Sequence, residues 1–393
     1  MSEPDPYAGR EQTLVKHLIL GKYLARFAHI IGFQWNSITY VDCFSGPWNV
    51  RSDDLKDSSF SIALEELKKA KETHHRLSGK SIALRCYFLE KDSTAYARLK
   101  QFTDQIHDAE IKTRNGALDS SIDDILDFVR TGGETFPFIF IDPTGWTGFA
   151  MQDIAPLLAL DPGETVINFI TGHIKRFIES PQDQTRESFT RLFGSADFKS
   201  RVEGLAKQDR EDALVAEYCD CVKRTGGFKY VSPAIVLHPE KDRTHFNLIY
   251  ATRHDSGLNA FKDAEKRAMK DMEHARAEAH RRRREQMSGM RDLFSSTDSA
   301  QDSNYYSTYY ESLRNRYLSR AQDSVERALR SKRQLAYDAA WALALEHPLT
   351  WESDLKDWIA AWVEKSALKI EGLIGKQRVP HREKGHTLVW ITD

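Results

Sequence analysis

The chain has 393 residues, 40% of them hydrophobic, which is enough for one large domain or for two domains with separate cores. Its 56 basic and 58 acidic residues give a net charge of -2, so any contact with nucleic acid must come from a local basic patch. No stretch reaches the ~18 apolar residues of a membrane helix, and residues 1–5 lack a leader's basic and apolar regions, which predicts a cytoplasmic protein without a membrane partner.

The chain begins with a predicted helix. Apolar residues recur at helical spacing from Leu14 to Ile31, ahead of the first predicted strand. Lys16 and His17 lie on this helix, where such residues are usually ordinary surface or core residues.

The first predicted strand runs into a tight turn with the sequence YVDCFSGP at residues 40–47. In dinucleotide-binding folds, such a turn carries several glycines that let the backbone approach a pyrophosphate. Here the turn has Gly46 alone, which suits S-adenosylmethionine, a ligand without phosphate whose ammonium Asp42 could hold. We therefore predict that Asp42, Phe44, Ser45 and Gly46 bind this cofactor.

Two further strands end in residues that suit the same ligand. An apolar run over 82–89 ends in Glu90 and Lys91, and an acidic residue at this place hydrogen-bonds a ribose in related folds. A short strand over 111–115 ends in Gly116 and Ala117, where adenine is expected. These four residues complete the predicted cofactor site.

The fourth strand is predicted over 136–141 and leads into Asp142, Pro143 and Trp146. In amino-methylating enzymes of this type, an acid or amide and a proline carbonyl accept hydrogen bonds from an amine, while an aromatic ring stacks on the base. These three residues are the predicted catalytic group. The alternatives are that turn amides satisfy Asp142 and that Trp146 belongs to the core.

Together these motifs resemble the three-Cys-motif partner (TcmP) family over about the first 270 residues. The resemblance is carried by residues 16–20, 23–24, 40–47, 140–146, 166–169, 176–177 and 246–253. It makes Lys16 and His17 candidates for lining the site. It implies a Rossmann-type S-adenosylmethionine-dependent methyltransferase and a partner protein with a three-Cys motif that is itself similar to radical S-adenosylmethionine enzymes. Trp48 and Ala117 depart from the family pattern, at the first and third strand tips.

Strands that alternate with helices predict a parallel sheet. Two β-rich runs, over 229–237 and 245–253, predict a final antiparallel hairpin, and residues 257–286 predict a long helix that becomes basic at its end. That end could bind phosphate, or it could be an ordinary solvated helix end. The basic residues concerned are Arg281, Arg282, Arg283 and Arg284.

The polar stretch at 291–304 predicts a linker between a methyltransferase-like α/β domain (1–290) and a helical domain (305–393). Helices followed by a basic hairpin over 378–390 predict a winged-helix-like domain, in which Arg378, Arg382 and Lys384 contact nucleic acid or a second protein. The alternative is a small helical packing domain.

The four cysteines are predicted to be buried thiols, and no metal site is predicted. Two functions are therefore open. One is a methyltransferase acting on nucleic acid, with a base amine favoured as acceptor, and the other is an inactive methyltransferase-like adaptor. A small-molecule methyltransferase is a third option that the basic segments disfavour.

Overall fold

The computed structural model describes residues 6–46, 50, 52, 54–172, 174, 183–288 and 307–392. The chain forms two compact units, Met1–Asp292 and Leu293–Asp393. Trp48, residues 176–177 and the predicted linker at 291–304 lie outside the described residues.

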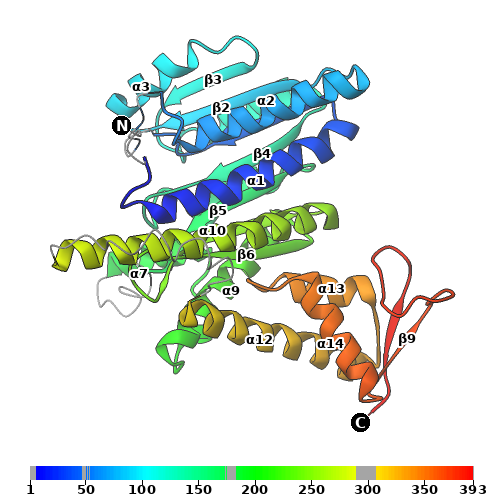
Figure 1. The fold of residues 1–393 in the computed structure, drawn as a ribbon. Helices are drawn as coiled ribbons and strands as arrows, with labels where there is room; N and C mark the ends of the chain where they lie inside the picture. The colour runs from blue at the N-terminus through cyan, green and yellow to red at the C-terminus, as the bar shows by residue number, and fades with distance from the viewer. Residues whose placement is uncertain are drawn as a thin grey trace. The chain divides into compact units, whose positions relative to one another are not determined.

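A seven-stranded sheet forms the centre of the first unit (Figure 1), with the strand order β3-β2-β1-β4-β5-β7-β6. Its strands are β1 (Ser37–Asp42), β2 (Ala83–Glu90), β3 (Glu110–Asn115), β4 (Phe136–Ile141), β5 (Glu164–Phe169), β6 (Tyr230–Leu237) and β7 (Thr244–Thr252). The predicted parallel sheet and the hairpin are confirmed. One detail is corrected: β7 alone runs against the other strands, because it pairs antiparallel with both β5 and β6, which leaves β6 parallel to β5.

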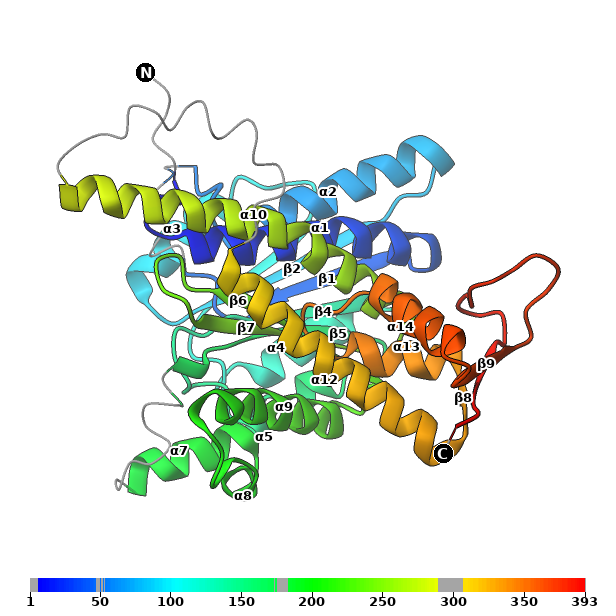
Figure 2. The same ribbon diagram turned by 60° about the horizontal axis from the view of Figure 1, so that its bottom comes forward.

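Helices cover both faces of this sheet (Figure 2). One face carries α1 (Glu11–Gln34), α2 (Ser59–Ser78), α3 (Ser93–Thr103) and α10 (Asp255–Ser288). The other face carries α4 (Ile122–Thr131), α5 (Met151–Leu158), α7 (Asp183–Phe193), α8 (Phe198–Val202) and α9 (Lys207–Gly226). None of the described helices is long and apolar enough to cross a membrane.

The strands are apolar on both sides because both faces are covered. On β4, Phe138 points to the α1 face, where its ring lies 5.7 Å from that of Tyr23 and 5.9 Å from that of Tyr40. Ile139 and Ile141 point the opposite way and belong to the core beneath α4, α5 and α9. The alternation of side chains along a strand thus divides the core into two layers.

The second unit contains α12 (Thr308–Lys332), β8 (Gln334–Ala336), α13 (Tyr337–Leu345), α14 (Glu352–Glu364), β9 (Leu368–Glu371) and β10 (Thr387–Trp390). Its three strands form an antiparallel sheet in the order β8-β10-β9. Sequence reasoning placed a hairpin within 378–390, and this is wrong in its boundaries. β10 lies between β8 and β9, and the strand that precedes it in the chain and pairs with it is β9, so residues 372–386 form a longer connecting loop.

Candidate functional site

Four strand tips meet at the carboxyl edge of the sheet. Asp42, the last residue of β1, is in register with Phe140 of β4 and Phe88 of β2, and Glu90 is in register with Asn115 of β3. The chain leaves β1 toward β2 on one side and returns to β4 on the other, and such a reversal of strand order is where open α/β sheets bind ligands. Sequence and topology therefore indicate the same edge.

Asp42 is fully buried and holds the turn that follows β1. Its Oδ1 accepts a hydrogen bond from the Phe44 amide at 3.1 Å, and its Oδ2 accepts one from the Ser59 hydroxyl at 2.8 Å. Burial raises the pKa of Asp42 to about 6, and the nearby charge of Asp142 adds to the increase. Because its carboxylate has no access to solvent, Asp42 shapes the turn and can act on a ligand only through that turn.

The rest of the turn is tied down by backbone contacts. Ser45 donates from its hydroxyl to the Asp42 carbonyl at 2.8 Å and from its amide to the Leu89 carbonyl at 2.8 Å. Phe44 packs against the core on the α4 side, and Gly46 is half-buried. Residues 47–49 lie outside the described residues, so the structure describes only the start of the predicted cofactor loop.

Asp142 follows β4 and has two hydrogen-bond donors. Lys16 of α1 donates to Oδ2, and Asn168 near the end of β5 donates to Oδ1 at 2.7 Å. The side chains of Lys16 and Asp142 are 13% and 12% exposed. Sequence reasoning singled out Lys16 and Asp142, but it gave Asn168 no role, because nothing local indicates that the tips of β4 and β5 meet there.

His17 lies beside Lys16 and is a different case. Its Nδ1 lies 3.0 Å from the Tyr7 hydroxyl, and the side chain is buried. Burial lowers the pKa of His17 well below its ordinary value, and the charges of Lys16 and Arg10 lower it further. His17 is therefore neutral near pH 7, in a packed position at the start of α1.

Glu90 and the third tip lie next to each other. Glu90 Oε1 accepts a hydrogen bond from the Asp92 amide at 2.6 Å, and burial raises the pKa of this carboxyl. The Gly116 amide donates to the Glu90 carbonyl at 3.0 Å. Ala117 and Lys91 are exposed. The tips of β2 and β3 thus bring Glu90, Gly116 and Ala117 together, as the cofactor prediction requires.

Trp146 is held by α7. Its Nε1 donates to the Ser188 hydroxyl at 3.1 Å, its ring lies 5.8 Å from the Phe189 ring, and it packs against the hydrophobic core. Pro143 is buried beside Asp142. These contacts agree with the alternative that Trp146 belongs to the core. A stacking role would use only the part of its ring that stays accessible.

The arginines at the end of α10 have different surroundings. Arg282 pairs with Glu11 at the start of α1, and Arg283 Nη1 lies 3.5 Å from Glu240 Oε2. Arg284 is exposed and Arg281 is half-buried. Part of the predicted phosphate-binding group therefore fixes α10 to the rest of the unit.

In the second unit, Arg382 stacks on a core tryptophan. Its guanidinium carbon lies 4.0 Å from the centre of the Trp341 ring, and its side chain is 15% exposed. Arg378 and Lys384 are exposed in the same loop. The three predicted contacts thus divide into one packed and two solvent-facing residues.

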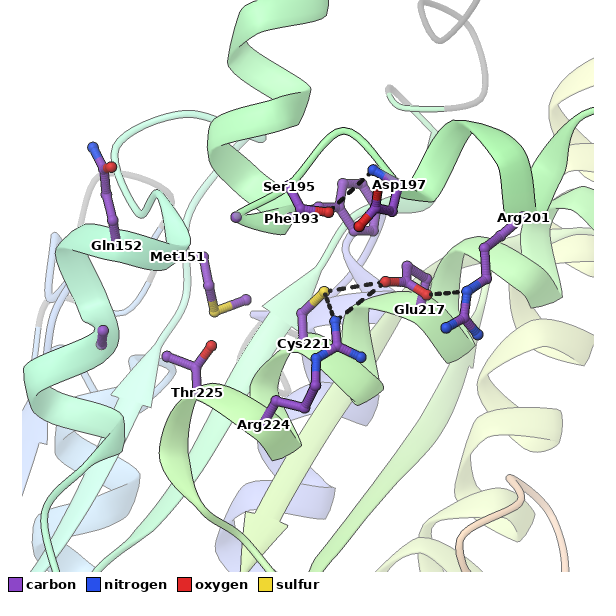
Figure 3. A pocket seen from close by; sticks show the side chains of 12 residues that line it. Met151, Gln152, Phe193, Ser195, Asp197, Arg201, Glu217, Cys221, Arg224 and Thr225 are labelled. Carbon is purple, nitrogen blue, oxygen red and sulfur yellow. Dashed lines mark hydrogen bonds and ion pairs between the residues drawn. The ribbon is translucent and has the colours of Figure 1, made fainter.

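A pocket of about 520 Å³ lies on the α5 and α9 face (Figure 3). Glu217, which is 2% exposed, pairs with Arg201 at 2.9 Å and Arg224 at 3.4 Å and accepts from the Cys221 thiol at 3.4 Å. Burial raises the pKa of Cys221 to about 12, so the thiol is protonated and unreactive. All four cysteines are buried, as predicted.

Comparisons with known proteins gave matches among solved structures only. No family model matches the chain, and no curated protein matches it. A Legionella pneumophila protein, LPL1258 of the family model DUF519, has a TM-score of 0.39 and 12% identity over 67% of this chain and 94% of that one. A loganic acid methyltransferase with SAH has a TM-score of 0.30 and 11% identity over 67% of this chain and 82% of that one.

At these TM-scores, neither likeness carries an argument. The class of fold follows from the strand order and from the antiparallel pairing of β7 in a sheet that is otherwise parallel, which define a Rossmann-like α/β first unit.

Proposed function

We propose that the first unit is an S-adenosylmethionine-dependent methyltransferase that methylates an exocyclic amine of a nucleic-acid base. The observation that carries this proposal is the meeting of Asp42 and Asp142 at the β1–β4 reversal, with Lys16 beside them. Two acids at this point suit a cationic methyl donor and an amine acceptor. A sheet edge whose polar groups only support the fold would need neither of these acids.

Residues of the first three tips would hold the cofactor. Glu90 would accept hydrogen bonds from the ribose, the Gly116–Ala117 turn would lie against the adenine, and the turn of Phe44, Ser45 and Gly46 would receive the amino-acid end. The bound cofactor supplies an electrophilic methyl group. This chain's own residues then orient the acceptor: Asp142 and the carbonyl of Pro143 accept from the amine, and the ion pair with Lys16 holds the Asp142 carboxylate in place.

The experiment has two steps, on the full chain. Titration calorimetry with S-adenosylmethionine should detect binding that Glu90→Ala weakens about tenfold, as expected for a lost hydrogen bond to a charged group. Labelled-methyl transfer to bulk RNA and DNA should then fall about 10²- to 10⁴-fold in Asp142→Ala, with cofactor affinity unchanged. Glu134→Ala is the control for both steps, because Glu134 is exposed and precedes the start of β4, away from the carboxyl ends of the strands.

Two results would count against the enzyme. A folded chain that gives no heat with millimolar cofactor leaves the adaptor function in its place. Full activity of Asp142→Ala would mean that the chemistry occurs elsewhere.

We also propose that the second unit is a winged helix whose loop at 372–386 contacts nucleic acid. Over residues 307–392, the part of this unit that the structure describes, three helices and a three-stranded antiparallel sheet support this interpretation. Replacing Arg378 and Lys384 together by Ala should reduce the slope of log affinity against log salt concentration by the amount expected for about two phosphate contacts. Lys369→Ala is the control, because Lys369 pairs with Glu371 on β9 at 3.2 Å. An unchanged slope would exclude this loop as a contact for nucleic acid.

A protein with a three-Cys motif is the proposed partner, and the chain is proposed to act with it in the cytoplasm. If the partner presents or modifies the substrate, methyl transfer by this chain should rise when both proteins are present. An unchanged rate, with no complex detected by size-exclusion chromatography, would remove the partner from the proposal.

A further inference from the structure

Lys16 and Asp142 form a donor–acceptor pair that the fold assembles from distant parts of the chain. The lysine lies in α1, and the aspartate follows β4, 126 positions later. An ammonium has three N–H groups, and each carboxylate oxygen accepts about two hydrogen bonds. The contact between the two side chains uses only one N–H and one acceptor position, so both groups have capacity for a ligand.

Asn168 fixes the orientation of this pair. Its amide donates to Asp142 Oδ1 at 2.7 Å, and the residue is 4% exposed. Within the described part of the chain, its own Oδ1 has no hydrogen-bond partner, and such a buried acceptor is unusual. The carboxylate is therefore held from two sides by Lys16 and Asn168, and the pair keeps one arrangement at the strand tips.

We propose that Lys16 and Asp142 together recognise the Watson–Crick edge of adenine or cytosine, an inference that rests on the proposed methyltransferase function. Asp142 accepts a hydrogen bond from the exocyclic amine, and Lys16 donates one to the adjacent ring nitrogen. In both bases, the amine and the ring-nitrogen acceptor are bonded to one carbon, which matches a protein acceptor and donor that touch each other. Enzymes that act on a base read its Watson–Crick edge in this way once the base has left the stack.

The other bases do not match this pair. On the same edge, guanine has a ring N–H beside its amine, so two donors would meet the Lys16 ammonium and Asp142. Uracil and thymine have no exocyclic amine. The site therefore selects for the chemistry it performs, because the atom that is recognised is the atom that is methylated.

The transfer step balances with these residues. The amine lone pair forms the new N–C bond, while the electron pair of the breaking C–S bond stays on sulfur. The methylated nitrogen then loses one proton, and Asp142 is the acceptor in hydrogen-bond contact with it. Lys16 takes no part in this proton transfer and acts as a positioning and specificity residue.

The test compares single-stranded oligonucleotides that contain adenine or 1-deazaadenine, in which the ring nitrogen is replaced by C–H. The wild type should methylate the analogue about 10- to 100-fold more slowly. Lys16→Met should show a similar loss on adenine and no additional loss on the analogue, because the same hydrogen bond is removed only once. Lys16→Arg should recover part of the rate, and 3-deazacytosine serves in the same way if cytosine is the acceptor.

A matched control is available on the same helix. Lys22 lies in α1, 3.5 Å from Asp271, and Lys22→Met should leave the rates on both substrates unchanged. Calorimetry on the same preparations should give wild-type cofactor affinity for Lys16→Met, which separates base recognition from cofactor binding and from misfolding.

Three outcomes would overturn the inference. Additive losses for Lys16→Met and the analogue would mean that Lys16 contacts something else. Base-resolved mass spectrometry that finds the methyl group on guanine or uracil would overturn it while leaving the methyltransferase intact. A wild type that binds cofactor and methylates no base would overturn both.

Discussion

Two polar clusters lie two turns apart along α1, and they differ in charge and in access to solvent. At the strand tips, Lys16 meets Asp142 and Asn168, with exposures of 13% and 12% for the two charged side chains. Further along the helix, Tyr23 donates to Glu164 Oε2, and Thr252 donates to Oε1 at 2.7 Å. The first cluster has opposite charges and a route to solvent, whereas the second has one acid and hydroxyl groups only.

A buried acid with a raised pKa is not by itself a functional residue. Burial raises the pKa of Asp42 at the tips and also the pKa of Glu164 in the second cluster. Structural networks perturb acids as active sites do, so the pKa does not separate them. Position separates the two acids, because Asp42 lies at the carboxyl end of β1, whereas Glu164 is the first residue of β5.

The largest expected effect is on stability. Glu164→Ala should lower the free energy of unfolding by about 3–5 kcal/mol, because the hydroxyls of Tyr23 and Thr252 would lose a buried acceptor. Asp142→Ala should cost about 1–2 kcal/mol, since Lys16 can reach water. Denaturant unfolding of both variants is the measurement. Equal losses would remove the distinction between the two clusters.

The next effect is a pH dependence at the strand tip. The folded-state pKa of Asp42, about 6, lies above the value of about 3.9 for an unfolded chain. The folded chain therefore binds this proton more readily, and the group's contribution to stability falls as pH rises from about 4 to about 6. The wild type should lose about 2–3 kcal/mol relative to Asp42→Asn over this interval.

Unfolding curves of the wild type and Asp42→Asn across that pH range test this expectation. The difference in unfolding free energy between the wild type and Glu164→Gln should change with pH in the same direction, because burial also raises the pKa of Glu164. Only Asp42→Asn should also weaken cofactor binding. Parallel curves for Asp42→Asn and the wild type would contradict the prediction.

A smaller effect tests how tightly the second cluster is packed. A Cβ atom at Gly257 would lie 2.4 Å from both Glu164 Oε1 and the Tyr250 hydroxyl oxygen. Gly257→Ala should therefore cost about 1–2 kcal/mol despite the better helix propensity of Ala. At Gly21 the nearest atom is Ile62 Cγ2 at 3.2 Å, so Gly21→Ala should be close to neutral by thermal unfolding. A neutral Gly257→Ala would indicate a loosely packed cluster.

The smallest effect compares two buried tyrosines. The Tyr40 hydroxyl lies 3.5 Å from Asp42 Oδ2, whereas the Tyr23 hydroxyl bonds Glu164 and lies 2.9 Å from the Tyr250 hydroxyl. Tyr40→Phe should cost at most about 0.5 kcal/mol, and Tyr23→Phe about 1–1.5 kcal/mol. Denaturant midpoints can resolve this difference, and the reverse order would mean that the Tyr40 bond is the stronger.

In the first unit, local sequence patterns were enough to predict the strands of the sheet and the residues at which they end. The apolar run of β4 and the turn residues after it predicted a strand that stops at Asp142, because a doubly covered strand is apolar throughout and polar residues begin where cover ends. The same local rules located Asp42, Glu90 and Gly116. Since carboxyl ends of parallel strands share an edge, these residues could be expected to meet without any coordinates.

Only the tertiary structure decided which side chains touch. Lys16 reaches Asp142 because α1 packs across the sheet with its first turns at the carboxyl edge, and Asn168 joins them through the register of β4 and β5. Trp146 on Phe189 and Arg382 on Trp341 are likewise contacts between distant segments. Spacing along a chain fixes periodicity and ends, whereas contacts between elements depend on how their faces pack, which no local pattern contains.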